Sequence, residues 1–403
     1  MPKTPPVNDW ATDYDIFDAG YVKDPVSVWN ELRGKCPIAH TERWGGSWLP
    51  TRYEDLQAFV RMVPALSSKE PLVVPGAVIE DPERDEYGLG APPITSDPPE
   101  QIPMRRMILP FFTPKATAEH RPFTEALCHQ LIDEFIDKGA CDAAVQYAQQ
   151  IPPRVIAHII GVDPNRAGEF VEWVQGVLEI GLADPETRTK YRRIIRNFFG
   201  DLVQQRRAKP TGDLISILLE QELNGEPVTD EIVVGMCNLL LIAGIDTTWS
   251  SIGSALWHFS THPEDRRRLA NEPELYPTAI EELLRYYSPV TMARIATEDI
   301  EVGDVTFREG DKVLMNFPAA NHDPDAFERA DEVVLDRQKN RHIAFGVGIH
   351  RCAGSNLARM EMDVALRIWF ERIPEFELTD ESAVTWAGGQ VRGPRSLPVS
   401  FPT

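Results

Sequence analysis

Apolar residues recur with helical spacing through most of the middle of the chain. Between about residues 114 and 287 they return every three or four positions, as on the buried face of an amphipathic helix. Alternating, strand-like segments lie near residues 44–53, 295–315 and 386–401. This pattern predicts an α+β fold that is mostly α-helical, with small β-sheets drawn from both ends of the chain. Neither an internal repeat nor a linker is visible, so we expect one domain over residues 1–403.

The strongest predicted helix begins after Thr229, a well-placed N-cap, and runs to about Thr261, just before a proline. At 1.5 Å per residue it would be roughly 50 Å long. Its first half is so apolar that it must cross the protein interior, where a polar side chain needs a reason to be present. The polar residues in its middle are Asp246, Thr247 and Thr248.

The composition restricts the possible partners and compartment. With 41 basic against 62 acidic residues the formal charge is −21, which repels nucleic acid and anionic lipid, so we expect neither as a partner. The N-terminus shows no secretion signal, and the apolar run over 232–245 is shorter than the roughly 20 residues that span a bilayer. We therefore expect a cytoplasmic protein without a membrane anchor. The five cysteines are far apart, without a C-x-x-C pair, which argues against disulfides or a zinc site.

One cysteine lies in a glycine-rich loop directly before a predicted amphipathic helix. In HIAFGVGIHRCAGSNLARMEMDVALRIWF, the pattern F-x-x-G-x-x-x-C-x-G is made by Phe345, Gly348, Cys352 and Gly354. A helix N-terminus favours a thiolate, and the glycines let the backbone approach the sulfur closely enough for a flat macrocycle to lie against the loop. A lone cysteine in such a turn is usually only a buried small hydrophobe. Four fixed positions within ten residues outweigh that interpretation.

This segment resembles the haem-binding loop of cytochromes P450. The resemblance implies the P450 fold, with haem b between the long central helix and the helix after the cysteine. It also implies that the Cys352 thiolate is the axial ligand of the haem iron and pushes electron density onto it, favouring O–O cleavage. The similarity extends over almost the whole chain, from TRYEDL near residue 51 to the final strand.

Two further motifs occur in the order that the family has. EELLRYYSP contains Glu282 and Arg285, which match the E-x-x-R pair, and the later stretch AFERADEVVLDR supplies Arg337. Two opposite charges at this spacing are often only a solvated surface pair. In the family, these three residues form a buried network that supports the fold and takes no part in the chemistry.

The polar cluster AGIDTT resembles the oxygen-activation motif of the family. The Thr247 hydroxyl can bond back to the carbonyl of Ala243 and bend the helix locally, while Gly244 removes a side chain that would block a close neighbour. We expect a groove over the iron, with Thr247 hydrogen-bonding dioxygen and Asp246 linking the site to solvent as a proton relay. The alternative is that these are ordinary helix residues at a polar interface.

Buried haem propionates need cationic or hydrogen-bonding partners. Matching positions are His350, Arg294 and Arg105, and Gln101 stands where most relatives have histidine. By analogy, the substrate pocket should include parts of 72–94 and 174–182, and it should be apolar. The residues predicted to line it are Ile94, Val174, Leu178, Leu240, Ala243, Val290, Met292, Gln390 and Val391.

The motifs predict a monooxygenase that inserts one atom of O2 into a hydrophobic small molecule, by hydroxylation or dealkylation. A peroxygenase or a gas-sensing haem protein would not need the Asp246–Thr247 pair, which argues against both alternatives. We expect no fused reductase, so electrons should come from a separate ferredoxin and ferredoxin reductase, and we expect a monomer. The ferredoxin should dock on a basic patch around the cysteine loop, unless these charges are merely scattered and solvated. The patch comprises Arg106, Lys115, Lys339, Arg351 and Arg359.

Overall fold

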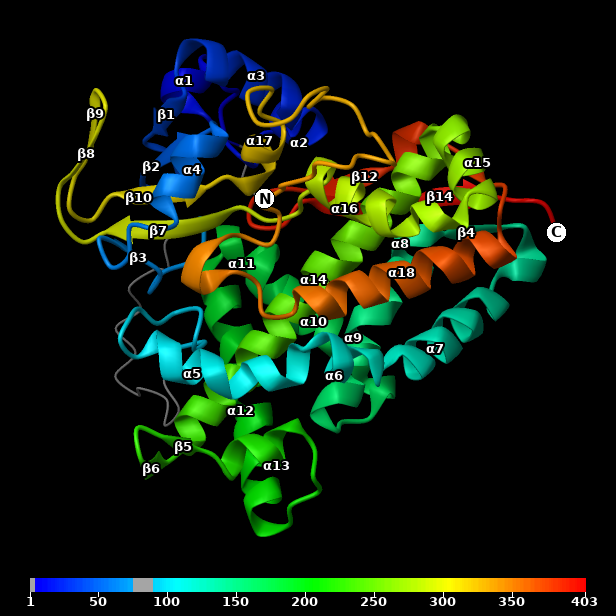
Figure 1. The fold of residues 1–403 in the computed structure, drawn as a ribbon, viewed down its shortest axis with the longest axis horizontal. Coiled ribbons are helices and arrows are strands. Elements are labelled where there is room, and N and C mark those ends of the chain that lie inside the picture. Colours follow the sequence, from blue (N-terminus) through cyan, green and yellow to red (C-terminus); the bar gives the residue numbers. More distant parts are fainter. Residues whose placement is uncertain (1–3, 75–89) are drawn as a thin grey trace.

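The computed structural model describes residues 4–74 and 90–403, and most of them form helices (Figure 1). The helices are α1 Trp10–Asp13, α2 Ala19–Lys23, α3 Pro25–Lys35, α4 Tyr53–Phe59, α5 Gln101–Ile108, α6 Pro114–Ala118, α7 Arg121–Asp133, α8 Ala143–Gln146, α9 Ile151–Ile160, α10 Ala167–Leu178, α11 Ile180–Ala183, α12 Pro185–Ala208, α13 Leu214–Leu219, α14 Asp230–Thr261, α15 Pro263–Asn271, α16 Tyr276–Tyr286, α17 Phe317–Asn321 and α18 Ser355–Arg372.

The strands are short. They are β1 Ile38–Thr41, β2 Ser47–Pro50, β3 Leu66–Ser67, β4 Ala140–Asp142, β5 Glu222–Leu223, β6 Glu226–Pro227, β7 Met292–Ala296, β8 Ile300–Val302, β9 Val305–Phe307, β10 Lys312–Met315, β11 Glu377–Leu378, β12 Thr385–Ala387, β13 Gly393–Ser396 and β14 Pro398–Ser400. The largest sheet has the order β1-β2-β10-β7-β3 and lies beside the N-terminal helices α1–α4 (Figure 1).

The strands join distant parts of the chain, as the sequence predicts. β2 pairs with β10 in parallel, and β10 pairs antiparallel with β7, so residues near 48 lie beside residues near 313. A second sheet has the order β11-β14-β4. β4 interrupts the region predicted to be helical, and the periodicity gave no sign of it because a strand of three residues is too short to show alternation.

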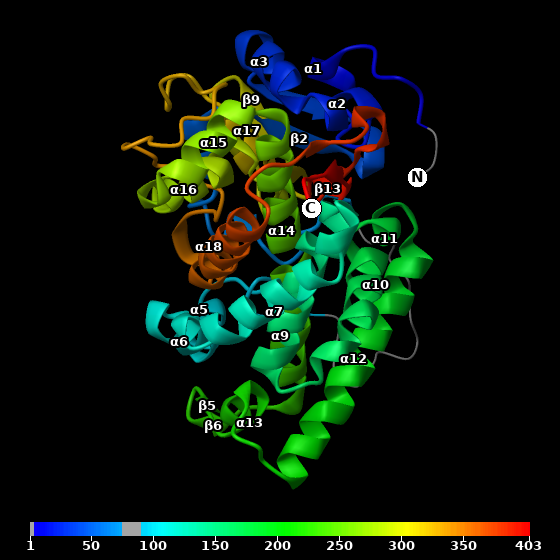
Figure 2. The same ribbon diagram turned by 90° about the vertical axis from the view of Figure 1, so that its right-hand side faces the viewer.

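The central helix α14 agrees closely with the prediction. The Thr229 hydroxyl accepts a hydrogen bond from the Ile232 amide at 3.4 Å, and acidic residues in the first turn favour the positive end of the helix dipole. α14 runs through the middle of the helical body in both ribbon views (Figures 1 and 2). It stays α-helical over all of Asp230–Thr261, so the local bend expected at Thr247 does not interrupt the helix.

Burial explains why α14 is so apolar. In the described residues it is the one helix long and apolar enough to cross a membrane, with a mean hydropathy of 1.6 over its most apolar 18-residue window. The sequence prediction considered a shorter apolar run, residues 232–245, which Asn238 interrupts. However, 67% of the window is buried inside the protein, as in a core helix.

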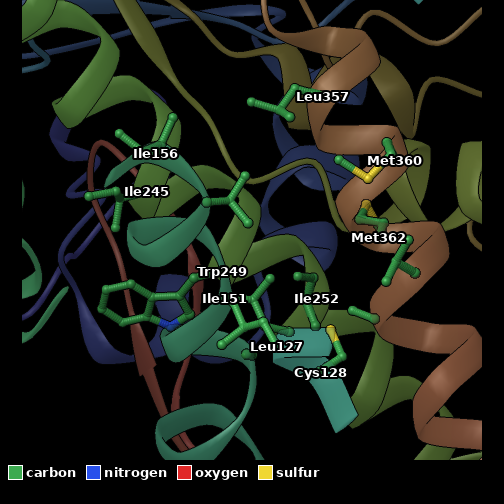
Figure 3. Packing of buried hydrophobic residues seen from close by; sticks show 14 of the residues in the cluster. Leu127, Cys128, Ile151, Ile156, Ile245, Trp249, Ile252, Leu357, Met360 and Met362 are labelled. Carbon is green, nitrogen blue, oxygen red and sulfur yellow. The ribbon is translucent and has the colours of Figure 1, made fainter. Parts of the chain in front are cut away.

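The main core lies where α7, α9, α14 and α18 meet, as Figure 3 shows. Each fully buried aliphatic or aromatic side chain contributes about 1.5–3 kcal/mol relative to an exposed one. In α18 the predicted apolar face is confirmed, because Leu357, Met360, Val364 and Ile368 are all buried. The core residues labelled in Figure 3 are Leu127, Cys128, Ile151, Ile156, Ile245, Trp249, Ile252, Leu357, Met360 and Met362.

Glu361 places an acid in this otherwise apolar helix face. Its side chain is fully buried, and neither carboxyl oxygen has a hydrogen-bond partner in the part of the chain described here. Burial therefore raises the pKa of Glu361 well above its ordinary value. The folded protein keeps this carboxyl protonated at pH values at which the unfolded chain has released the proton.

We expect Glu361→Gln to make the free energy of unfolding less dependent on pH. Because the folded-state pKa is raised, the native protein holds more protons than the unfolded chain, and the parent loses stability as the pH rises above about 4.5. The glutamine variant lacks this loss. The difference between its free energy of unfolding and that of the parent should therefore grow by up to about 1.4 kcal/mol per pH unit until the folded-state pKa is reached. Urea unfolding of the holoprotein between pH 4.5 and 8 measures the effect.

Glu371→Gln is the matched control, since Glu371 lies exposed in the last turn of the same helix. The difference in free energy of unfolding between Glu371→Gln and the parent should not change with pH. An equal pH dependence in both variants would show that Glu361 is ionised in the native protein.

Candidate active site

The cysteine loop has the geometry that its glycines predict. The amide of Cys352 donates to the carbonyl of Phe345 at 2.8 Å, which closes the loop. Gly346 and Gly348 have φ of +64° and +71°, in the left-handed region that residues with a side chain avoid. A Cβ on Gly354 would lie 4.0 Å from the Cys352 sulfur, and the Gly354 amide hydrogen-bonds that sulfur. The backbone therefore wraps closely around the thiol, as expected.

The loop does not favour the thiolate by itself, contrary to our expectation. The Cys352 side chain is exposed, but desolvation by the surrounding protein is the largest influence on its thiol and raises the pKa. The Gly354 amide and the charges of Arg105, Arg351 and Arg359 lower the pKa by less. Metal coordination deprotonates a thiol outright, so an iron bound by this sulfur would favour the thiolate.

Three of the predicted propionate ligands come together beside the cysteine loop. Burial, with a smaller contribution from the charges of Arg294 and Arg105, lowers the pKa of His350 to about 4. The Nε2 atom of His350 lies 2.8 Å from the Ser68 hydroxyl. Burial lowers the pKa of Arg294 to about 10, and its Nε has no hydrogen-bond partner in the described residues. Asp97 is the nearby acid that acts on both Arg294 and His350.

Gln101 has a different partner from the one predicted. Its side chain is 1% exposed, and its amide nitrogen donates to the carbonyl of Ile349 at 2.8 Å, in the cysteine loop. Arg105, one turn later in α5, donates to the carbonyl of Arg351. Helix α5 therefore holds the cysteine loop from one side, and Gln101 serves as a support for that loop.

These residues fit a haem. Haem brings an iron that binds a thiolate and two propionates that need cations or hydrogen-bond donors. Cys352 supplies the sulfur. Arg294 supplies a buried guanidinium with a spare N–H, and His350 and Arg105 supply further donors beside it. The glycines leave room against the loop, as noted above.

The E-x-x-R residues and the later arginine form one buried network. Glu282 accepts from Arg285 Nε at 2.9 Å and Nη2 at 2.8 Å, and from Arg337 Nε at 2.8 Å. The Arg285 Nη1 donates to the carbonyls of Asn321 and Ala330, each at 2.7 Å. Burial raises the pKa of Glu282, but its arginines outweigh this and keep it below the ordinary value. The surface-pair alternative is wrong, because Glu282 and Arg285 are fully buried.

The middle of α14 presents two residues to open space. Ala243 is exposed and Thr247 is half-buried, although Ile245, Asp246 and Thr248 are buried. The Thr247 hydroxyl donates to the carbonyl of Ala243 at 2.9 Å, as predicted.

Gly244 has a different role from the predicted cofactor contact. A Cβ there would lie 2.7 Å from Cδ1 of Ile156, in α9. The glycine therefore allows α9 and α14 to pack closely. Its missing side chain faces the interface with α9.

Asp246 is not in contact with solvent, contrary to the simple relay that we expected. It is 1% exposed, and its Oδ1 accepts from Ser250 Oγ at 3.1 Å and from Arg395 Nη2 at 2.8 Å. Arg395, in β13, also forms an ion pair with Glu179. Sequence reasoning missed Arg395 and Glu179, since no local spacing relates residues that lie 149 and 67 positions from Asp246.

The residues predicted to line the substrate pocket differ in burial. Ile94, Val290 and Met292 are half-buried, so with Ala243 they can contact a ligand. Gln390 is buried, and its side-chain amide is engaged: its oxygen accepts from the Val73 amide at 2.8 Å. Most of segment 72–94 lies outside the described residues. The remaining predicted pocket residues are buried and belong to the main core: Val174, Leu178, Leu240 and Val391.

The predicted docking charges separate into two groups. Arg106, Lys115, Lys339 and Arg351 are exposed. Arg359 is not a free surface charge, because it is bound to Glu281 through two nitrogens and lies 4.5 Å over the ring of Phe345. Burial alone would raise the pKa of Glu281, but Arg359 and His342 lower it to about 2. Arg359 therefore holds the cysteine loop to α16.

Comparisons with known proteins agree with this site. A family model described as "Cytochrome P450" matches residues 186–381. The mycinamicin IV hydroxylase/epoxidase of Micromonospora griseorubida is 34% identical over 92% of this chain and 94% of its own length. The 6-deoxyerythronolide B hydroxylase of Saccharopolyspora erythraea is 33% identical over 96% and 98% of the two chains. The solved structure of PksS, a polyketide synthase cytochrome P450 from Bacillus subtilis, superimposes with a TM-score of 0.87 at 30% identity, covering 97% of this chain and 100% of its own.

Fold, site and relatives together define a haem-containing monooxygenase that uses O2. The chain belongs to the cytochrome P450 family, and its matched relatives are bacterial.

Proposed function

We propose that this enzyme inserts one atom of O2 into a hydrophobic small molecule, by hydroxylation or dealkylation, with electrons from a separate ferredoxin and ferredoxin reductase. The Asp246–Thr247 pair carries this proposal. A hydroxyl held toward open space stands next to a fully buried acid on the central helix. A peroxygenase or a gas sensor would have no use for a protonated acid beside such a hydroxyl.

The proposed roles follow from the contacts described above. When bound, haem b supplies the binding and reduction of O2. Cys352 would hold the iron, while Arg294, His350 and Arg105 would bind the propionates. The Thr247 hydroxyl donates a hydrogen bond to the Ala243 carbonyl. Its oxygen can therefore still accept a hydrogen bond from the reacting group or from Asp246. Asp246 would supply the proton, since burial raises the pKa of its carboxyl.

The pocket supports an apolar substrate with few polar groups. Ile94, Ala243, Val290 and Met292 can contact a ligand and offer only apolar side chains. Two relatives are named for mycinamicin IV and 6-deoxyerythronolide B, and a third for polyketide biosynthesis. Polyketides are therefore the first compounds to screen for a shift of the haem from low to high spin. We further propose that residues 1–403 act as one monomeric haem domain in the cytoplasm.

Two measurements on the parent protein test the proposed reaction. Its reduced, carbon-monoxide-bound form should show the strongly red-shifted Soret band of thiolate ligation. With a compound that shifts the spin state, product should form with O2 and a reconstituted electron supply, and poorly with hydrogen peroxide alone. Efficient turnover with peroxide would favour the peroxygenase, and tight binding without turnover would favour the sensor.

The exposed charges around the cysteine loop support docking of an acidic ferredoxin. Arg106 lies on α5 near Ile102, four residues earlier, and Leu109, which directly follows α5, and these two apolar residues are 42% and 38% exposed. The donation from Arg105 to the Arg351 carbonyl shows that α5 lies beside the cysteine loop. A local basic and apolar patch can bind an acidic partner despite the net charge of −21, because salt screens charges beyond about 8 Å.

We expect Arg351→Glu or Lys339→Glu to slow reduction by the ferredoxin roughly tenfold at low ionic strength. Stopped-flow reduction of the haem measures this rate. Spectral shifts on substrate binding should be unchanged. Lys209→Glu is the control, since this exposed lysine lies just past the C-terminal end of α12 and carries the same charge change. Equal rates in all variants, independent of salt, would place docking elsewhere or on apolar contacts.

A further inference from the structure

Asp246 shares its arginine with a second acid. The Arg395 guanidinium lies 4.2 Å over the ring of Trp249 and binds Asp246 through Nη2, Ser250 through Nη1 and Glu179 through Nε. Asp246 and Glu179 therefore bind different nitrogens of one guanidinium. The second oxygen of Asp246, Oδ2, is buried and has no hydrogen-bond partner in the described residues.

Strand β13 is fixed so closely to α14 that Arg395 has little freedom. A Cβ on Gly393 would lie 2.3 Å from Cβ of Ser250, and one on Gly253 would lie 2.8 Å from Cγ of Pro394. Glycine at both positions brings the strand against the helix. With its backbone anchored in this way, Arg395 can change its pairing only by small movements of its side chain.

Glu179 belongs to a less regular part of the molecule. It is the residue between α10 and α11, with φ −119° and ψ −75°, so the helix is broken at this position. Its side chain is 21% exposed, compared with 1% for the side chain of Asp246, and the next residue, Ile180, is 59% exposed. The ion pair with Arg395 thus connects a helix break near the surface to the buried acid of the central helix.

Two carboxylates and one guanidinium leave one negative charge unbalanced when both acids are ionised. Burial is the largest influence on each acid and raises the pKa of both, and the charge of Asp246 raises the pKa of Glu179 further. Arg395 lowers both pKa values. In the described chain, Arg395 and Glu179 are the charged groups that face Asp246. Burial and this excess of acids over cations favour a proton on one of the two carboxyls.

We propose that Glu179 is a positioning residue: by holding Arg395, it sets how firmly this arginine binds Asp246 and thereby whether Asp246 keeps its proton. Arginine does not release a proton under these conditions, so Glu179 acts through charge and geometry and does not pass a proton along. When Glu179 is ionised and paired with Arg395, the positive charge of this arginine is divided between the two carboxyls, and Asp246 keeps its proton. When Glu179, at the helix break, moves away from Arg395, the positive charge of this arginine acts on Asp246 alone, and Asp246 ionises. The value of this control for catalysis rests on the proposed proton-donor role of Asp246.

The test is the infrared band of a protonated carboxyl in the holoenzyme, assigned to Asp246 by its loss in Asp246→Asn and titrated against pH. Glu179→Gln removes the competing negative charge. We expect the midpoint of this titration to move down by on the order of one pH unit. Coupling of NAD(P)H use to product formation should fall at neutral pH and recover at lower pH. Glu179→Asp keeps the charge and should restore most of the parent midpoint, which also covers the case in which the glutamine variant folds poorly.

Glu172→Gln is the matched control. Glu172 lies on α10 two turns before Glu179, is exposed, and accepts a hydrogen bond from the Tyr191 hydroxyl at 2.8 Å. In Glu172→Gln, the titration midpoint of the Asp246 carboxyl band should equal that of the parent. An unchanged midpoint in Glu179→Gln, an equal shift in Glu172→Gln, or the absence of any carboxyl band sensitive to Asp246→Asn would each overturn the proposal. If the midpoint shifts as expected but Asp246→Asn remains fully coupled, Glu179 still positions Arg395, and only the proton-donor role of Asp246 fails.

Discussion

Replacing Cys352 with serine should abolish the red-shifted Soret band of the reduced, carbon-monoxide-bound enzyme. A neutral hydroxyl is a far poorer ligand for iron than a thiolate, and in the described chain no second cysteine lies in this loop. The remaining contacts of the site, above all the cations at the propionate positions, would still hold haem. We therefore expect haem to be retained in part, product formation to fall to background, and the carbonyl band to move to the position of ordinary ligation.

Cys36→Ser is the control for this substitution. Cys36 is half-buried, and its sulfur lies 3.4 Å from the carbonyl of Ile38, far along the chain from the loop. It should keep the band and the activity of the parent. A red-shifted band that survives in Cys352→Ser would disprove thiolate ligation by this residue.

Thr247→Ala should leave haem and substrate binding nearly intact while it diverts electrons to hydrogen peroxide. In the proposed mechanism the hydroxyl acts only after oxygen has bound, and among the described residues its one hydrogen-bond partner is the Ala243 carbonyl within the same helix. Its loss therefore costs the fold little. We expect product formed per NAD(P)H consumed to fall on the order of tenfold or more, as for the loss of a group that assists proton transfer.

The same helix offers a matched control in Thr261. Its hydroxyl also donates to a carbonyl four residues earlier, that of Trp257, at 2.9 Å. Thr261→Ala removes the same kind of hydrogen bond at the end of α14, and coupling should stay at the parent value. Thr247→Ser keeps the hydroxyl and should retain most of the coupling. If Thr247→Ala is as tightly coupled as the parent, Thr247 has no part in the mechanism.

The sequence by itself determined the features whose physics is local. The Thr229 cap, the end of α14 at Thr261 and the apolar face of α18 each depend on hydrogen bonds or spacing within a few residues, so they could be predicted and are confirmed. The cysteine loop belongs with them, because its closure depends on glycines within the loop itself. The bond from Thr247 to Ala243 spans one helical turn and was predicted for the same reason.

Only the tertiary structure decided which distant groups share a partner. Gly244, predicted to contact haem, faces Ile156. Arg359, predicted to be a free docking charge, binds Glu281. Gln101, predicted to bind a propionate, donates to the Ile349 carbonyl. Side-chain type shows that a charge needs a partner once it is buried, but it does not show which partner the packing brings near. The joining of Asp246 to Glu179 through Arg395 exists because β13 crosses α14 at Gly393 and Ser250, and the chain sets that crossing only when the whole core is assembled.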